Sequence, residues 1–195
     1  MAAAFLLLGF GGWQLGAAGY IHAKAWLSQV LLGEAWADTL AKAEDGPTLN
    51  MPWPWADTGP VARLKVPALG VDQIVLAGAS GRTLAFGPGH LDETAVPGAA
   101  GHSVISGHRD THFAFLRDLV PDTKLEVQRA DGAWQSYRVR ASQVIDSRTA
   151  RLSLAAERPA LTLVTCWPFD TAEPGGPLRY AVFAEATEDF VPPNP

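Results

Sequence analysis

The chain contains a single cysteine, Cys166, in a setting that favours a nucleophile. An apolar, β-branched run at residues 161–165 is typical of a buried strand, and Trp167-Pro168 follows, where proline cannot continue a central ladder. We therefore expect the thiol at a strand end that faces a loop, where the backbone is fixed and the sulfur is accessible. A structural cysteine, which packs as a small hydrophobe, would more naturally lie within the strand.

A nucleophilic cysteine needs a base or a cation nearby, because a free thiol is mostly protonated at neutral pH. His108 is the best candidate, since it ends the strand-like run 102–107 and so lies at a second strand-to-loop boundary. His112 is the nearest rival. The two histidines would share one face if their segment were helical, which leaves metal binding open, although two histidines alone make an incomplete zinc site.

Arg179 is the third candidate. It opens the last strand-like run, directly after the loop that begins at Cys166 and passes Gly175-Gly176-Pro177. An arginine that returns beside a nucleophile can stabilise the oxyanion of an acyl-transfer intermediate. Taken alone, it would be a solvated charge at a strand end.

Short β-branched and apolar runs separated by turn signals must position these residues, and they predict a mostly β barrel or sandwich. Asp131-Gly132 predicts a hairpin turn, because a primed turn needs residues that tolerate positive φ. Short helical turns are expected near residues 82–86, 113–119 and 153–157. The predicted strands are residues 61–66, 71–76, 102–107, 124–129, 134–140, 161–165 and 178–185.

The N-terminal part predicts a different organisation. Residues 2–21 carry no charged side chain and are long enough, at about twenty residues, to cross a bilayer, so we assign 1–22 to a transmembrane anchor. A cleaved signal peptide is the competing interpretation. Residues 23–60 combine an amphipathic helix with a Pro/Trp-rich linker at 51–60, and the helix could lie on the membrane or pack against the domain at 61–190. Its predicted polar face holds Lys24, Ser28, Glu34, Asp38, Thr39 and Lys42, opposite Trp26, Val30, Trp36 and Leu40.

Composition narrows the function classes. Apolar residues make up 48% and charged residues 18% of the chain, which is compatible with a folded core and not with intrinsic disorder. The net charge of -5, without a long basic run, argues against a nucleic-acid partner. One cysteine excludes an intramolecular disulfide framework and a four-cysteine zinc site.

Three segments resemble those of a known family, the sortases, and they occur along the chain in the same order as in that family. The segment that ends in Cys166 matches the sortase signature Thr-Leu-X-Thr-Cys, and an arginine opens the next strand. The segment 101–113 resembles the strand and loop that carry the sortase histidine, and 86–90 also has the look of the family. Residues 12–14 and 19–25 resemble the subgroup of Gram-negative proteobacteria, the marine-type class.

The resemblance implies an eight-stranded β-barrel, with the strand missing from our count near 142–146. It implies a cysteine transpeptidase in which Cys166 is the nucleophile, His108 the general acid/base and Arg179 the oxyanion partner. No acidic ligand set matches the calcium-binding members, so we expect no metal and no cofactor.

The implied substrate is a membrane-held partner protein with a C-terminal sorting motif similar to Leu-Pro-X-Thr-Gly, which is transferred to an amine. For a Gram-negative source, the enzyme would be anchored in the inner membrane by a single span with its barrel in the periplasm. The alternatives are a catalytically silent, membrane-tethered peptide-binding module and a hydrolytic cysteine endopeptidase.

Overall fold

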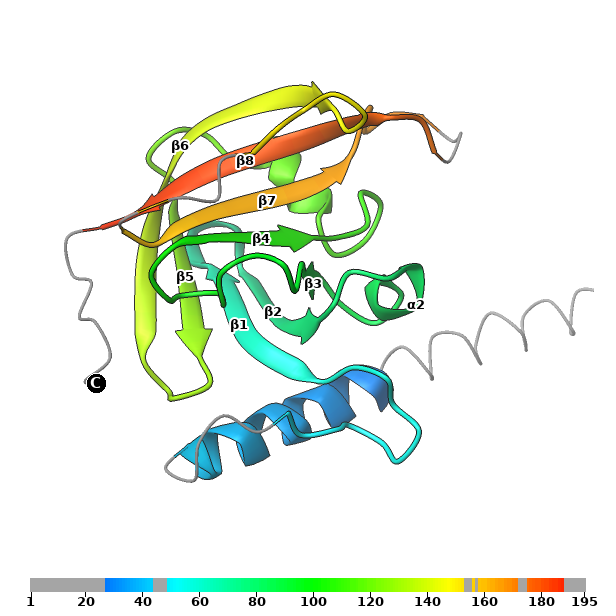
Figure 1. Cartoon of the computed structure of the whole chain (residues 1–195), viewed down its shortest axis with the longest axis vertical. Helices are drawn as coiled ribbons and strands as arrows, with labels where there is room; N and C mark the ends of the chain where they lie inside the picture. The colour runs from blue at the N-terminus through cyan, green and yellow to red at the C-terminus, as the bar shows by residue number, and fades with distance from the viewer. Residues whose placement is uncertain (1–26, 44–48, 153–155, 157, 172–174, 188–195) are drawn as a thin grey trace, which may run out of the picture.

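The computed structural model describes residues 27–43, 49–152, 156, 158–171 and 175–187. Eight strands form a closed barrel in the order β1-β2-β3-β4-β7-β8-β6-β5 (Figure 1). The strands are β1 (Pro60–Val66), β2 (Val71–Ala77), β3 (Gly89–His90), β4 (His102–Ser106), β5 (Lys124–Arg129), β6 (Trp134–Asp146), β7 (Ala160–Cys166) and β8 (Leu178–Ala186). This confirms the eight-stranded, mostly β architecture.

Helical structure in the described part of the chain is limited. Residues 27–41 form a helix that lies beside β1, below the barrel in Figure 1. The remaining helical elements are short turns: η2 (Pro67–Leu69), α2 (Gly81–Leu84) and η3 (Ala114–Asp118). The last two agree with the helical turns expected near 82–86 and 113–119, while most of the turn expected at 153–157 lies outside the described residues.

The barrel is closed by antiparallel pairings, apart from two parallel ones, β2 with β3 and β4 with β7. The β4–β7 pairing is the longer of these and runs in register from His102↔Ala160 to Ser106↔Val164. Parallel neighbours point the same way, so β4 and β7 end at the same edge of the sheet. Cys166 is the last residue of β7, and His108 lies two residues beyond the end of β4.

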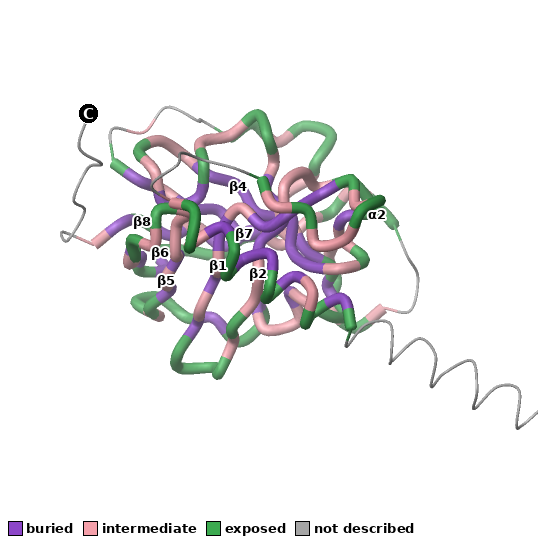
Figure 2. Tube along the Cα trace, turned by 90° about the horizontal axis from the view of Figure 1, so that it is seen from below, coloured by how far each residue is buried: buried purple, intermediate pink, exposed green. Residues whose placement is uncertain are grey.

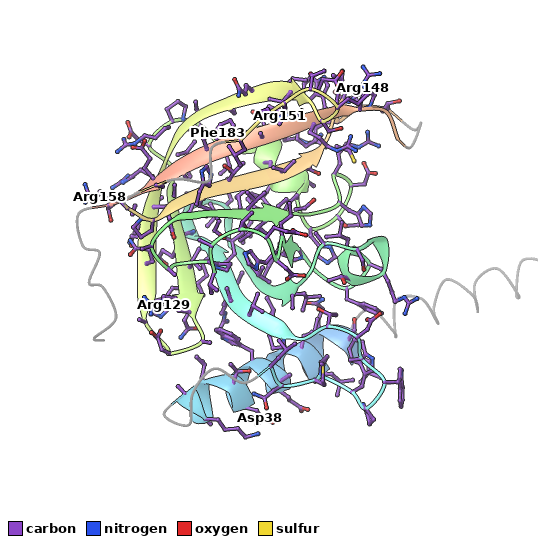
Figure 3. All side chains as sticks on the ribbon, in the orientation of Figure 1. Asp38, Arg129, Arg148, Arg151, Arg158 and Phe183 are labelled. Carbon is purple, nitrogen blue, oxygen red and sulfur yellow. The ribbon has the colours of Figure 1, made fainter. Side chains whose placement is uncertain are left out.

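The interior of the barrel is packed rather than hollow, as the side chains in Figure 3 show. Alternate residues of each strand point inward, because successive side chains in a strand face opposite sides. On β7, Leu161 and Leu163 lie in this core, opposite Ala184 and Val182 of β8. In Figure 2, much of the buried, purple part of the chain therefore lies in the strands. The opposite face of β7 carries Thr162, Val164 and Cys166.

The eighth strand is not where the sequence placed it. Residues 142–146 continue β6, which is 13 residues long and is interrupted by an irregular register between Val139 and Ala141. The strand missing from the prediction is β3, whose two residues are too few to show an alternating pattern. Asp131-Gly132 forms the predicted hairpin turn, with Gly132 at φ 83°.

The predicted faces of the N-terminal helix are partly wrong. Ser28 and Thr39, assigned to the polar face, are buried, whereas Val30 is exposed. Thr39 is tolerated there because its hydroxyl donates to the Ala35 carbonyl at 2.9 Å and accepts from the Asn50 amide at 3.0 Å. The helix packs on the barrel, one of the two placements left open.

Two bonds fix the helix to the barrel. The Trp36 indole donates to Gln128 Oε1 of β5 at 3.2 Å, and the Gln29 amide donates to the Phe86 carbonyl at 2.7 Å. Within the described residues, no helix has the length and apolarity needed to span a bilayer. The predicted anchor at 1–22 lies outside the described residues.

His90 of β3 is a buried titratable group in the barrel wall. Its Nε2 lies 2.9 Å from the Ala95 carbonyl and 3.0 Å from Thr94 Oγ1. Burial lowers the pKa of His90 below its ordinary value of 6.5, because the charged imidazolium loses hydration. The unfolded chain therefore binds more protons than the folded chain as the pH falls below about 6.5.

We predict that folding stability falls as the pH drops from about 7 to about 5, and that His90→Gln makes this slope shallower. Glutamine places an amide donor near the position of Nε2 and does not titrate. Thermal unfolding of both proteins across this range measures the difference. Equal slopes would show that His90 does not titrate differently in the folded and unfolded states.

Candidate active site

Cys166 and Arg179 are direct partners in the antiparallel β7–β8 ladder. Side chains of directly opposite residues project from the same face of a sheet, so the thiol and the guanidinium stem leave the barrel on the same side. Both residues are half-buried. The prediction that Arg179 returns beside the cysteine therefore agrees with the register.

His108 reaches the same face from β4. The last β4–β7 pair is Ser106↔Val164, and the Gly107 amide donates to the Val164 carbonyl at 3.1 Å as part of this pair. His108 is the next residue, in line with Cys166. The His108 side chain is exposed, as expected for the outer face of the sheet, which carries Ser106 and Val164.

Gly107 fixes the point at which the chain leaves β4. Its carbonyl accepts a hydrogen bond from the buried Thr165 hydroxyl at 2.7 Å. A Cβ at this position would lie 2.6 Å from Cγ of the fully buried Phe113, so only glycine fits without a shift. The Phe113 amide also donates to the His108 carbonyl at 2.9 Å, which closes the loop tightly behind the histidine.

His112 lies near His108 but in a different environment. Gln73 of β2 donates to the His112 backbone carbonyl at 2.8 Å, and the ring is half-buried. Burial, with a smaller contribution from the positive charge of His108, lowers the pKa of His112. Segment 107–113 forms turns rather than a regular helix, so the helical arrangement on which the metal interpretation depended is not formed. Across the described ranges, no group of three or more metal-binding side chains gathers.

Arg179 is held at the mouth of the β7–β8 loop. Its Nη1 donates to the Gly176 carbonyl at 2.7 Å and to the Leu178 carbonyl at 2.8 Å. A guanidinium carries five N–H donors, so Nε and Nη2 remain to bind an anionic oxygen. The backbone thus orients the guanidinium near the start of β8.

Comparison with known proteins shows to which family this chain belongs. The model of the sortase domain matches residues 64–187, which is more than half of the chain. The chain belongs to the sortase family.

Individual relatives agree with this assignment. Sortase D of Bacillus subtilis (strain 168) is 28% identical over 123 residues, which cover 63% of this chain and 61% of that protein. Sortase C-1 of Actinomyces oris superimposes with a TM-score of 0.56 at 27% identity, over 78% of this chain and 98% of that one. A Clostridium perfringens sortase D5 transpeptidase gives 0.62 at 20% identity, over 82% and 96%, and so supports the fold alone.

The sequence reasoning missed a buried arginine that lies beside the candidate residues. Arg109 directly follows His108, yet it is only 7% exposed. It donates from Nη1 to the Pro168 carbonyl at 2.5 Å and from Nη2 to the Thr171 carbonyl at 2.8 Å, both in the loop after Cys166. Its hydrogen bonds to Asp110 lower the pKa of that carboxyl group. No local signal marks such a residue, because its loop partners are distant backbone carbonyls.

An aromatic cluster supports the same loop. Trp167 stacks on Tyr180 with ring centroids 5.6 Å apart, and Phe169 packs edge-on against both rings. The Arg117 guanidinium lies 4.8 Å from the Phe169 ring centroid. The residues that flank Cys166 and Arg179 are therefore held by side-chain packing as well as by the β7–β8 ladder.

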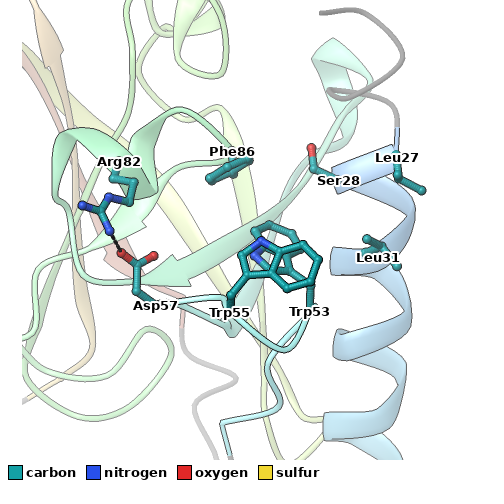
Figure 4. A pocket seen from close by; sticks show the side chains of 8 residues that line it. All are labelled: Leu27, Ser28, Leu31, Trp53, Trp55, Asp57, Arg82 and Phe86. Carbon is teal, nitrogen blue, oxygen red and sulfur yellow. Dashed lines mark hydrogen bonds and ion pairs between the residues drawn. The ribbon is translucent and has the colours of Figure 1, made fainter. Parts of the chain in front are cut away.

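A separate hollow of about 420 Å³ lies between the N-terminal helix, the Trp-rich linker and α2 (Figure 4). Its lining is mainly apolar, and an ion pair between Arg82 and Asp57, 2.9 Å long, stands at its edge. None of the three candidate residues lines it. The other lining residues are Leu27, Ser28, Leu31, Trp53, Trp55 and Phe86.

We predict that Thr165→Val lowers the activity of the sortase, because the Gly107 carbonyl loses its hydroxyl donor and His108 loses its fixed position. The loss in folding free energy should be about 1–3 kcal/mol, the cost of an unsatisfied buried acceptor. Chemical denaturation and single-turnover reaction with the peptides described below measure the two effects.

Thr162→Val is the matched control. Thr162 lies on the same strand, is equally buried, and shares a hydrogen bond of 2.7 Å with the His102 ring, away from the strand end. It should lose stability but keep its activity at temperatures where it is folded. Equal losses of activity in both folded variants would contradict a specific role for the Thr165–Gly107 bond.

Proposed function

We propose that this sortase is a cysteine transpeptidase that acts through a thioacyl-enzyme. The observation that carries the proposal is the edge of the sheet that β4, β7 and β8 share. An exposed imidazole lies just past the end of β4, the thiol ends β7, and a guanidinium lies at the start of β8. Nucleophile, proton carrier and oxyanion donor are the three groups that acyl transfer needs. Membership of a family of cysteine transpeptidases supports the same chemistry.

In the first half-reaction, the Cys166 thiolate attacks the carbonyl carbon of the scissile peptide bond, and the electron pair moves to the carbonyl oxygen. Arg179 donates hydrogen bonds to this oxyanion. His108, protonated by the thiol, gives its proton to the leaving nitrogen as the carbon–nitrogen bond breaks. The products are a thioester on Cys166 and the released amine.

In the second half-reaction, an incoming amine attacks the thioester carbonyl. His108 accepts the proton of the amine, the carbon–sulfur bond breaks, and Cys166 is restored. Water in place of the amine would give hydrolysis through the same steps. Transfer and hydrolysis therefore differ only in which nucleophile reaches the thioester.

For the substrate, we propose a partner protein held at the membrane, with a C-terminal sorting motif similar to Leu-Pro-X-Thr-Gly. The support is membership of the family, whose members act on proteins that carry sorting motifs. The matched region spans 61% of the Bacillus subtilis relative. The acceptor is an amine.

We also propose that residues 1–22 tether the sortase to the inner membrane of a Gram-negative cell, with the barrel in the periplasm. The uncharged sequence of this segment supports the tether, as does the neighbouring surface, where Trp55 is 82% exposed and Leu27 is exposed beside it. Tryptophan favours the boundary between lipid and water. A tether raises the effective concentration of a membrane-held substrate.

The proposal predicts a thioacyl adduct when the full chain is mixed with Leu-Pro-X-Thr-Gly peptides. Intact-mass measurement should show it in the wild type and not in Cys166→Ala, which lacks the nucleophile. Arg179→Ala should slow its formation about 10²–10³-fold, as expected for the loss of an oxyanion donor. His108→Ala should slow it about 10²–10⁴-fold, whereas His112→Ala, the matched control, should stay within a few-fold of wild type.

Product analysis with an added amine separates transfer from hydrolysis. An amide product supports the transpeptidase, and release of free acid alone would identify a hydrolytic endopeptidase. If folded wild-type protein binds the peptides but forms no adduct across a varied peptide library, the proposal fails in favour of a silent binding module.

A further inference from the structure

Arg109 joins the two loops that carry the proposed acid/base and the proposed nucleophile. It is covalently next to His108, and its guanidinium donates to the Pro168 and Thr171 carbonyls, which are 59 and 62 residues further along the chain. Both carbonyls lie within five residues of Cys166 in the β7–β8 loop. One side chain therefore connects the end of β4 to the segment that follows the end of β7.

Four of the five N–H donors of the planar Arg109 guanidinium, its fork, make hydrogen bonds in this arrangement. Nε and Nη2 donate to the two oxygens of Asp110, at 2.9 and 3.3 Å, while Nη1 and Nη2 reach the loop carbonyls. Asp110 is itself largely exposed, so it orients the guanidinium without being buried. A planar group with several fixed donors can make these bonds together, whereas a lysine ammonium is a single point from which the donors diverge.

The buried charge also lies within electrostatic reach of the sulfur. The hydrogen bonds to Asp110 raise the pKa of Arg109, and negative charge on Cys166 contributes in the same direction. The guanidinium is therefore charged whenever the thiolate forms. A cation that is largely shielded from solvent is screened less by salt than an exposed one.

We propose that Arg109 is a positioning residue that holds the Cys166 loop against the His108 loop and places a fixed positive charge near the reacting sulfur. This goes beyond the three residues of the proposed mechanism. The turnover part of the test rests on the proposed function, but the part that concerns the sulfur does not.

The sulfur can be tested without a substrate, because the chain contains one cysteine. Neutral iodoacetamide and anionic iodoacetate alkylate a thiolate by the same displacement, so the ratio of their rates reports the local charge. Arg109→Met should lower the iodoacetate-to-iodoacetamide ratio about threefold or more, and Arg109→Lys should keep it within about twofold of wild type, since it retains the charge. A purely structural role for Arg109 would slow both reagents alike.

Peptide turnover tests the positioning. Arg109→Met and Arg109→Lys both lack the planar guanidinium that bonds to the two loops. In both variants kcat should fall about tenfold or more, with KM changing less, because misplaced catalytic groups slow the chemical step. The matched control is Arg117→Met, which removes an arginine that packs on Phe169 of the same loop but is far more exposed. It should leave both the kcat and the alkylation ratio within about twofold of wild type.

Wild-type kcat in Arg109→Lys would overturn the positioning role, because the fork would then be dispensable. An unchanged alkylation ratio in folded Arg109→Met would overturn the electrostatic role. If Arg109→Met does not fold, the alkylation ratio measured in Arg109→Gln tests the electrostatic role instead. The kcat of Arg109→Lys then tests the positioning role. If wild-type protein turns over no peptide, the proposed function fails, while the alkylation ratios still decide whether Arg109 acts on Cys166.

Discussion

The parallel pairing of β4 with β7 is the constraint on which the site depends. Because the two strands run in the same direction and in register, they end side by side. The register alone therefore brings the residues at these ends, Cys166 and the His108 segment, to one edge of the sheet. Gly107, the residue before His108, is fixed to β7 by two hydrogen bonds. Its amide donates to the Val164 carbonyl, and its carbonyl accepts from the Thr165 hydroxyl. A side chain at Gly107 would displace the Phe113 ring, so the strand end and the core beneath it are coupled.

The β7–β8 ladder adds the third group to this edge. Cys166 and Arg179 are opposite each other, and the residues directly after Cys166 are held by the aromatic cluster and by Arg109. The barrel core supplies the rigid side of this arrangement, since Leu161 and Leu163 anchor β7 from within. Reactive groups on short extensions of a packed sheet can be accessible and still be well positioned, which is what acyl transfer with two successive acceptors requires.

The sequence was most informative where chemistry and strand ends coincide. The positions of Cys166 and His108 at strand ends could be predicted, because Cys166 follows the β-branched run 161–165 and His108 follows the strand-like run 102–107. β3 could not, because two residues show no periodicity, and the extension of β6 was hidden by its exposed polar residues Ser142 and Gln143. The helix face was misassigned because Thr39 is polar but is satisfied by Ala35 and Asn50, and Arg109 was missed because its loop partners are backbone carbonyls, which sequence type does not reveal.

The central claim, that the ends of β4 and β7 place residues 108 and 166 side by side, can be tested by a disulfide. The only native cysteine is Cys166, so mild oxidation of the folded His108→Cys variant at low concentration can form one intramolecular bond, which needs Cα atoms roughly 4.4–6.8 Å apart. The account predicts rapid closure, detected as a loss of two mass units in the monomer, and much slower closure in His112→Cys. A folded His108→Cys variant that keeps both thiols free, while His112→Cys oxidises, would contradict the account.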